Sequence, residues 1–171
     1  MASITQPLRD EHKELYPHVE SLRLAGDAVN ESLTSSAHAK IEDVYNFLTR
    51  QLLPHAQAEE KALYPIVQKV MGAAQATATM SRDHVEVERL TQELGSLRVH
   101  KSQLSITFDQ TRALRRVLYG LYALVKVHFA KEEEIYLPLL DSKLTAEEAR
   151  TMFENMEAAA HEAKERLPRQ I

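Results

Sequence analysis

Apolar residues recur every three or four positions along most of this chain, which is the spacing of one face of an α-helix. The first such stripe contains Leu8, Leu15 and Val19, and three others cover residues 41–66, 80–97 and 114–139. Long amphipathic helices bury their apolar faces best against one another. The pattern therefore predicts an all-α fold, namely an antiparallel (up-down-up-down) four-helix bundle over about residues 7–140.

A further helix is expected after the bundle. The segment Thr145-Ala-Glu-Glu148 has the capping-box pattern of a helix start, and one side of the following residues carries Met152, Met156 and Leu167. We expect an additional C-terminal helix over about residues 145–167, packed outside the bundle. The whole chain, residues 1–171, is then a single domain.

Two kinds of local signal refine the helices. Ser35 or Ser36 is expected to cap the second helix, since serine hydroxyls accept hydrogen bonds from the first turn. Prolines within helical segments remove a backbone hydrogen bond and bend the axis. Bends, rather than domain boundaries, are therefore expected at Pro17, Pro54, Pro65 and Pro138.

The composition limits the available chemistry. The 171 residues include no cysteine and eight histidines, which excludes disulfides, thiolate metal sites and thiol catalysis. Basic and acidic residues number 21 and 25 and are interspersed, which gives no nucleic-acid surface. No apolar run approaches the roughly 20 residues of a membrane helix, and the N-terminus lacks a signal-peptide pattern. We expect a cytoplasmic protein without nucleic-acid or membrane partners.

An internal repeat brings histidine and glutamate into the apolar stripes. His55-Ala-Gln-Ala-Glu59-Glu60 recurs 73 residues later as His128-Phe-Ala-Lys-Glu132-Glu133, and each copy is followed by a proline. Upstream of each copy a further histidine lies on its own stripe. The residues in register with the stripes are His12, His55, Glu59, His84, His128 and Glu132.

These six residues predict a metal centre. Histidine with glutamate four positions later occurs five times in the chain, so the spacing alone is uninformative. For any single histidine, a core side chain bonded to backbone or glutamate is an equal alternative. For all six together that alternative fails, because the stripes hold no lysine or arginine to compensate buried carboxylates. Two metal ions, each bound by two histidines and bridged by the glutamates, satisfy the set.

The order of these residues resembles the hemerythrin-like, or HHE cation-binding, proteins, in the subgroup with the pattern H, HxxxE, H, HxxxE. The resemblance covers about Leu8 to Leu140 and implies a four-helix bundle with a non-haem di-iron centre. Oxygen-carrying hemerythrins have H-x3-H on the third helix and H-x4-D on the fourth. This chain has Glu88 at the second position of the former motif and His128-x3-Glu132 in place of the latter. Reversible oxygen storage is therefore disfavoured.

Several other residues are secondary candidates. Glu88 is either a ligand or a solvated residue, and Tyr16 is either a ligand, an auxiliary hydrogen-bond donor to the centre, or core filling. Glu60 and Glu133 either orient a histidine N–H or, as we favour, face solvent. The other tyrosines and phenylalanines are interpreted as core residues. The remaining histidines miss the stripes and are expected at the surface: His18, His38, His100 and His161.

The donor set and the resemblance together define the expected chemistry. Nitrogen and carboxylate ligands with open positions suit iron and also manganese. The resemblance implies two iron ions with a bridging oxo or hydroxo group. Our leading hypothesis is reaction with hydrogen peroxide or related small oxidants (O2, NO), with catalase- or peroxidase-like turnover at the metal centre itself. The alternatives are an oxygen, nitric oxide or iron sensor without turnover, and a metal-free helical adaptor. The oligomeric state is left open.

Overall fold

The computed structural model describes residues 3–30, 32–98 and 105–166. All secondary-structure elements in this part of the chain are helices, and its one isolated β-bridge pairs Ser32 with Ser105. The predicted all-α fold is confirmed. The elements are α1 (Gln6–Ala28), α2 (Ser35–Phe47), η1 (Leu48–Leu52), α3 (Leu53–Ala58), η2 (Glu59–Leu63), α4 (Tyr64–Met71), α5 (Ala78–Leu97), α6 (Phe108–Lys131), η3 (Glu132–Tyr136), α7 (Leu137–Lys143) and α8 (Ala146–Glu165).

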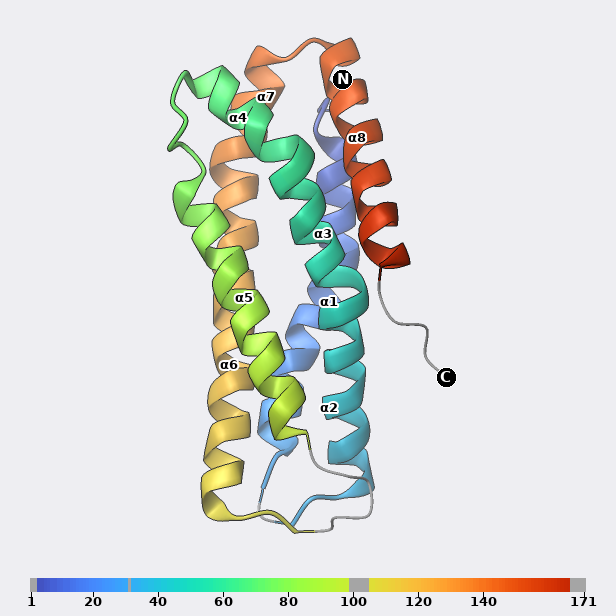
Figure 1. Cartoon of the computed structure of the whole chain (residues 1–171), viewed down its shortest axis with the longest axis vertical. Helices are drawn as coiled ribbons and strands as arrows, with labels where there is room; N and C mark the ends of the chain where they lie inside the picture. Colours follow the sequence, from blue (N-terminus) through green and yellow to red (C-terminus); the bar gives the residue numbers. More distant parts are fainter. Residues whose placement is uncertain (1–2, 31, 99–104, 167–171) are drawn as a thin grey trace.

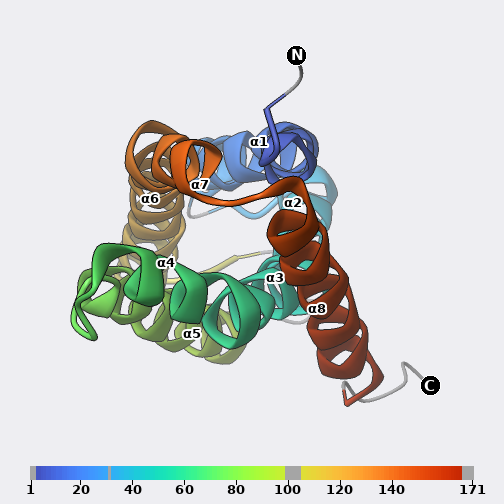
Figure 2. The same ribbon diagram turned by 90° about the horizontal axis from the view of Figure 1, so that it is seen from above.

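The helices lie side by side along the long axis of the molecule (Figure 1). The chain descends through α1, ascends through α2 to α4, descends through α5, ascends through α6 and α7, and descends again through α8. Helix α1 packs on α2 and α6, and α5 packs on α6 and α3, so the helices enclose a common interior (Figure 2). Among the described residues, no helix combines the length and the apolar character needed to cross a membrane.

Capping residues define several helix starts. Thr145 accepts a hydrogen bond from the backbone of Glu148 and forms the predicted capping box at the start of α8. Thr107 forms an equivalent box with Gln110 at the start of α6. The cap of α2 is Thr34, whose hydroxyl accepts from Ala37 N, so the expectation of Ser35 or Ser36 was wrong by one or two residues. Gly72, with a φ of 64°, ends α4 in the left-handed region that favours glycine.

Three of the four internal prolines follow a π-helical turn. Each of η1, η2 and η3 closes with an N–H bonded to the carbonyl five residues earlier, and Pro54, Pro65 and Pro138 lie two residues beyond their ends. A π turn inserts one extra residue into the helix. The inserted residue accommodates the loss of the backbone hydrogen bond that proline cannot donate. Helix α1, in contrast, continues through Pro17 without such a turn.

The π turns shift the buried face by one residue. The stripes predict Ile66 and Ile135 inside the core. After η2, Val67 is buried and Ile66 is partly buried against the core, whereas within η3 Tyr136 is buried and Ile135 is 57% exposed. A straight helix keeps its apolar face in one register, whereas an inserted residue rotates everything that follows. The prediction for Ile135 was wrong for that reason, whereas Ile66 still packs against the core.

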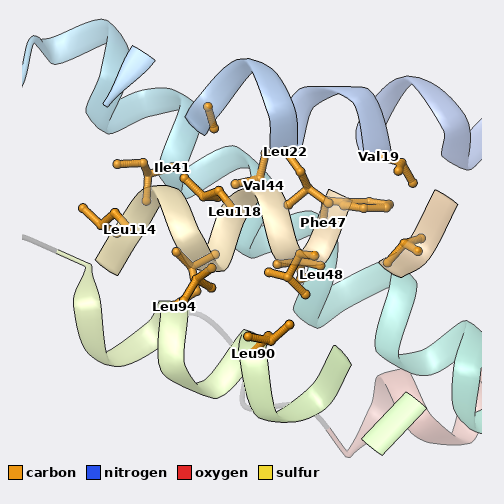
Figure 3. Packing of buried hydrophobic residues seen from close by; sticks show 14 of the residues in the cluster. Val19, Leu22, Ile41, Val44, Phe47, Leu48, Leu90, Leu94, Leu114 and Leu118 are labelled. Carbon is orange, nitrogen blue, oxygen red and sulfur yellow. The ribbon is translucent and has the colours of Figure 1, made fainter. Parts of the chain in front are cut away.

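Two apolar clusters fill the interior. The larger joins α1, α2, α5 and α6, and Figure 3 shows Leu22, Val44, Leu94 and Leu118 pointing into it from four helices. The smaller joins the start of α1 with α4, α7 and α8, and includes Leu8, Tyr64 and Met152. The predicted site residues lie between the two clusters, so apolar side chains close the site at both ends of the bundle.

Helix α8 packs on α3 and η2, and two methionines lie on its buried face. Met152 and Met156 are 2% and 5% exposed, whereas Glu154 is exposed on the opposite face. We expect Met152→Ala to lower the free energy of unfolding by about 2 kcal/mol, since it leaves a cavity in a packed contact. Chemical denaturation measures this loss. Glu154→Ala is the matched control and should change stability by less than about 0.5 kcal/mol; equal effects would contradict this packing.

Candidate metal centre

The structure brings the six predicted residues together at one level of the bundle. Both glutamates are fully buried, and each is the first residue of a π turn: Glu59 of η2 and Glu132 of η3. The histidines reach the same level from α1, α3, α5 and α6. Three of them, His12, His55 and His128, are buried, and the side chain of His84 is 11% exposed.

Glu59 lies between two pairs of histidines. Its Oε1 atom is 3.0 Å from His55 Nε2 and 3.8 Å from His12 Nε2. Its Oε2 atom is 3.2 Å from His84 Nε2 and 3.9 Å from His128 Nε2. Each carboxylate oxygen therefore faces one pair, as a bridging carboxylate would.

Glu132 spans the same two pairs from the opposite side. Its Oε2 atom lies 3.4 Å from His12 Nε2, and its Oε1 atom lies 3.5 Å from His128 Nε2. Ligand atoms of two three-residue groups lie within 4.8 Å of one another, and Glu59 belongs to both groups: His12, His55 and Glu59, and Glu59, His84 and His128.

The inward-facing atoms fit a bound cation. Buried atoms without a hydrogen-bond partner include Nε2 of His12 and His55, both carboxylate oxygens of Glu59, and Oε2 of Glu132. Leaving such groups unsatisfied costs about 1–3 kcal/mol each, and more when they are charged. Metal ions would satisfy them together, and imidazole nitrogen with carboxylate oxygen is a donor set that iron and manganese accept.

A second layer of carboxylates holds the outer nitrogen of every histidine. Each carboxylate comes from a neighbouring helix, so the four contacts form a closed ring around the bundle. A neutral imidazole that donates Nδ1–H outward directs its Nε2 lone pair inward, toward a metal. The pairs are His12 with Glu133 at 3.2 Å, His55 with Glu11 at 3.0 Å, His84 with Glu60 at 2.8 Å, and His128 with Asp83 at 3.1 Å.

This layer bears on two earlier candidates and adds two residues. Glu60 and Glu133 contact histidines, which supports the alternative that they orient a histidine N–H, and Glu60 is at the same time exposed to solvent. Glu11 and Asp83 were missed, although each directly precedes a site histidine in the sequence. Their partners lie on adjacent helices, which a pattern within one helix does not reveal.

Tyr64 was also missed. Its hydroxyl donates to Glu132 Oε1 at 3.0 Å and lies 3.4 Å from Nε2 of both His84 and His128. Its ring stacks on His84 with a centroid distance of 5.4 Å. Burial and the nearby charges of Glu59 and Glu132 raise the pKa of Tyr64. The tyrosine therefore keeps its proton, and the π turn before it explains why a straight helical stripe did not place it at the site.

The electrostatics of the centre favour protonated imidazoles at His55 and His128 in the absence of metal. Burial lowers the pKa of His128, but its hydrogen bond to Asp83 and the carboxylates of Glu132 and Glu59 outweigh burial and raise that pKa to about 11. Burial also opposes the charged form of His55, but Glu59 and Glu11 raise its pKa well above the usual value. Metal ions therefore compete with protons for these nitrogens.

The other candidates lie outside this cluster. Tyr16 packs edge-on against Phe129 with ring centroids 5.7 Å apart, and Glu88 is exposed and accepts a hydrogen bond from Gln92. Within the described ranges, neither residue has a recorded contact with the six. Their placement agrees with a core-filling tyrosine and a solvated glutamate.

The remaining histidines are away from the centre. His18 and His161 are exposed, as expected. His38 is buried, which corrects its expected surface position. It lies in the first turn of α2, where Leu33 and Ile106 from the connecting segments are also buried, so the helical stripe does not decide its exposure. His100 and Leu167 lie outside the described residues.

The helices and their interior define a metal-binding helical domain, since the clustered imidazoles and carboxylates can hold metal. A family model, the hemerythrin HHE cation binding domain, matches residues 3–140. The chain therefore belongs to the hemerythrin HHE cation-binding family, and α8 lies beyond the matched region. No curated protein and no solved structure matches the chain.

Proposed function

We propose that this protein is a non-haem di-iron protein that reacts with hydrogen peroxide or related small oxidants. The observation that carries the proposal is the pair of ligand groups that share Glu59, with buried atoms that lack hydrogen-bond partners. One ion would be held by His12 and His55, and the other by His84 and His128. Glu59 and Glu132 would bridge the two ions, together with an oxo or hydroxo group; manganese is an alternative metal.

The surrounding residues would keep this centre ordered and dry. The outer carboxylates fix the histidine rings, and the two apolar clusters exclude water from both ends. Tyr64 holds a proton at its hydroxyl oxygen, next to Glu132, where the hydroxyl can orient a small polar molecule by hydrogen bonding. Two adjacent irons, when bound, supply a reversible two-electron change and act as Lewis acids.

The proposed turnover is catalase-like: two molecules of hydrogen peroxide give one O2 and two water molecules. One peroxide is reduced by two electrons with cleavage of its O–O bond and uptake of two protons. The other is oxidised by two electrons to O2 and releases two protons. With an external reductant in place of the second peroxide, the same site would act as a peroxidase.

Metal analysis and visible spectroscopy of the protein as isolated test the proposal. We expect two irons per chain, an absorption band of an oxo-bridged centre, and a spectral change with O2 evolution after peroxide is added. A loaded protein that evolves no O2, and consumes no peroxide with a reductant present, would refute turnover. An NO- or O2-responsive spectrum without turnover would indicate a sensing or binding module instead.

The outer carboxylates provide a further prediction. Glu133→Ala removes the acceptor for His12 Nδ1, and we expect metal affinity to fall by about 10- to 100-fold. Competition with a chelator of known affinity measures the change. Glu134→Ala is the matched control, because this neighbouring residue is exposed. Equal affinities of the two variants would exclude the role of Glu133.

The proposal also includes the frame of the centre. We take residues 1–171 as a single hemerythrin-like domain, with an antiparallel four-helix bundle over about residues 7–140 and α8 as an additional helix. The cytoplasmic location stays a prediction from the sequence.

A further inference from the structure

The internal repeat gives the centre two related halves, one with His12 and His55 and the other with His84 and His128. His55, Glu59 and Glu60 have counterparts 73 residues later, and His12 has its counterpart in His84, 72 residues later. Equivalent residues make equivalent hydrogen bonds: the outer nitrogen, Nδ1, of His12 pairs with Glu133, and that of His84 pairs with Glu60. Departures from this symmetry therefore identify features that belong to one half only.

The half that contains His12 is closed by aromatic rings. Phe129 stacks on His12 with ring centroids 4.2 Å apart and planes within 10°, and it also meets His55 edge-on. Tyr16 packs edge-on against Phe129. The side chain of His12 is accordingly 0% exposed.

The half that contains His84 lacks these two rings, and the ring that stacks on His84 is that of Tyr64, with a centroid distance of 5.4 Å. The repeat counterpart of Phe129 is Ala56, and the counterpart of Tyr16 is Glu88. A cavity of about 430 Å³ occupies this side, between the α3–η2 segment and α5, and its lining includes Ala56, Glu88 and His84. His84 is 11% exposed there, the largest exposure among the four site histidines.

We infer that small neutral oxidants reach the centre through this cavity, which we call the His84 cavity, and meet the metal position held by His84 and His128 first. This inference deepens the proposed function and rests on it. The position held by His12 and His55 is then the more protected one. The two metal positions have similar ligands but different access, because an alanine replaces a phenylalanine at one repeat position.

The charge of the cavity favours neutral molecules. Glu60 and Glu88 both line it, and its one lysine, Lys61, is paired with Glu162 of α8. Carboxylates that line an opening repel anions. Hydrogen peroxide, O2 and nitric oxide are neutral and small enough to pass, whereas azide or superoxide would be disfavoured.

A second cavity provides the competing route. It has a volume of about 400 Å³, lies beneath α8, and is lined by His55, Glu11 and Ala160, among others. His55 is only 3% exposed, and the Phe129 ring packs against it. This side should therefore contribute little to access.

Nitric oxide binding to the reduced, iron-loaded protein tests the route without requiring turnover. Val85 lines the mouth of the His84 cavity and is 52% exposed. We expect Val85→Phe to slow nitric oxide binding about tenfold, with the metal content unchanged. Val127→Phe is the matched control, since this valine of α6 is 57% exposed and does not line the cavity; we expect a change of less than about twofold.

Other outcomes separate the route from the function. Equal rates for the two valine variants, or a slower rate only for Ala160→Phe beneath α8, would overturn the route. Binding of nitric oxide without peroxide turnover would refute the enzymatic function but leave the route supported.

If the protein binds no iron, modification by diethyl pyrocarbonate decides the route: His84 should react faster than His12, and Val85→Phe should slow the reaction of His84. Equal reaction of the two histidines would overturn the route.

Discussion

Replacing Glu59 with glutamine is expected to remove most of the stabilisation that iron gives to this protein. Each oxygen of Glu59 faces a different histidine pair, so a single substitution affects both metal positions. Two sites filled at roughly 100 to 1,000 times their dissociation constants stabilise the folded state by about 5–8 kcal/mol. This corresponds to a rise in melting temperature of about 10–30 °C. We expect Glu59→Gln to lose more than about half of that rise.

The measurement is the difference between the melting temperatures with and without ferrous iron, so any effect on the metal-free protein cancels. Glu88→Gln is the matched control: Glu88 also lies four residues after a site histidine but is exposed. It should keep the full iron-dependent rise. If Glu59→Gln keeps it as well, Glu59 does not bind metal and the bridging arrangement fails. A metal-free helical adaptor would show no rise in any variant.

Much of the fold follows from helical periodicity. The stripes require amphipathic helices, and His55 and Glu59 lie one turn apart on a buried face, as their spacing predicts. Periodicity fails at the π turns: in η3, one inserted residue moves Ile135 out of the core and Tyr136 into it. The sequence marks these turns by a proline six residues after the first residue of each. That signal was interpreted only as a bend.

The candidate site divides in the same way. Its inner residues could be predicted because a buried glutamate or histidine on an apolar stripe is costly without a partner. Its outer carboxylates could not, because Glu11 and Asp83 lie off the stripes and contact histidines of other helices. Such contacts depend on helix rotation and spacing, which periodicity does not define. Tyr64 combines both problems, since it follows a π turn and contacts residues on α5, α6 and η3.

Phe129→Ala is expected to have the second large effect, a loss of about 3–5 kcal/mol in the free energy of unfolding of the metal-free protein. Phe129 is 1% exposed, stacks on His12 and contacts the rings of His55 and Tyr16, so its removal leaves a cavity beside the buried carboxylates. Chemical denaturation without metal measures the loss. Phe108→Ala is the matched control on α6, because Phe108 is 62% exposed, and it should cost less than about 0.5 kcal/mol.

The same substitution relates stability to access. Phe129→Ala gives the His12 half the residue that the His84 half has naturally at Ala56. In the iron-loaded protein it should open a second route, so that adding Val85→Phe no longer slows nitric oxide binding. A double variant that binds nitric oxide as slowly as Val85→Phe alone would show that Phe129 does not close its side. With the expected result, one repeat position contributes packing energy in one half of the bundle and substrate access in the other, and the two functions are separated by a single side chain.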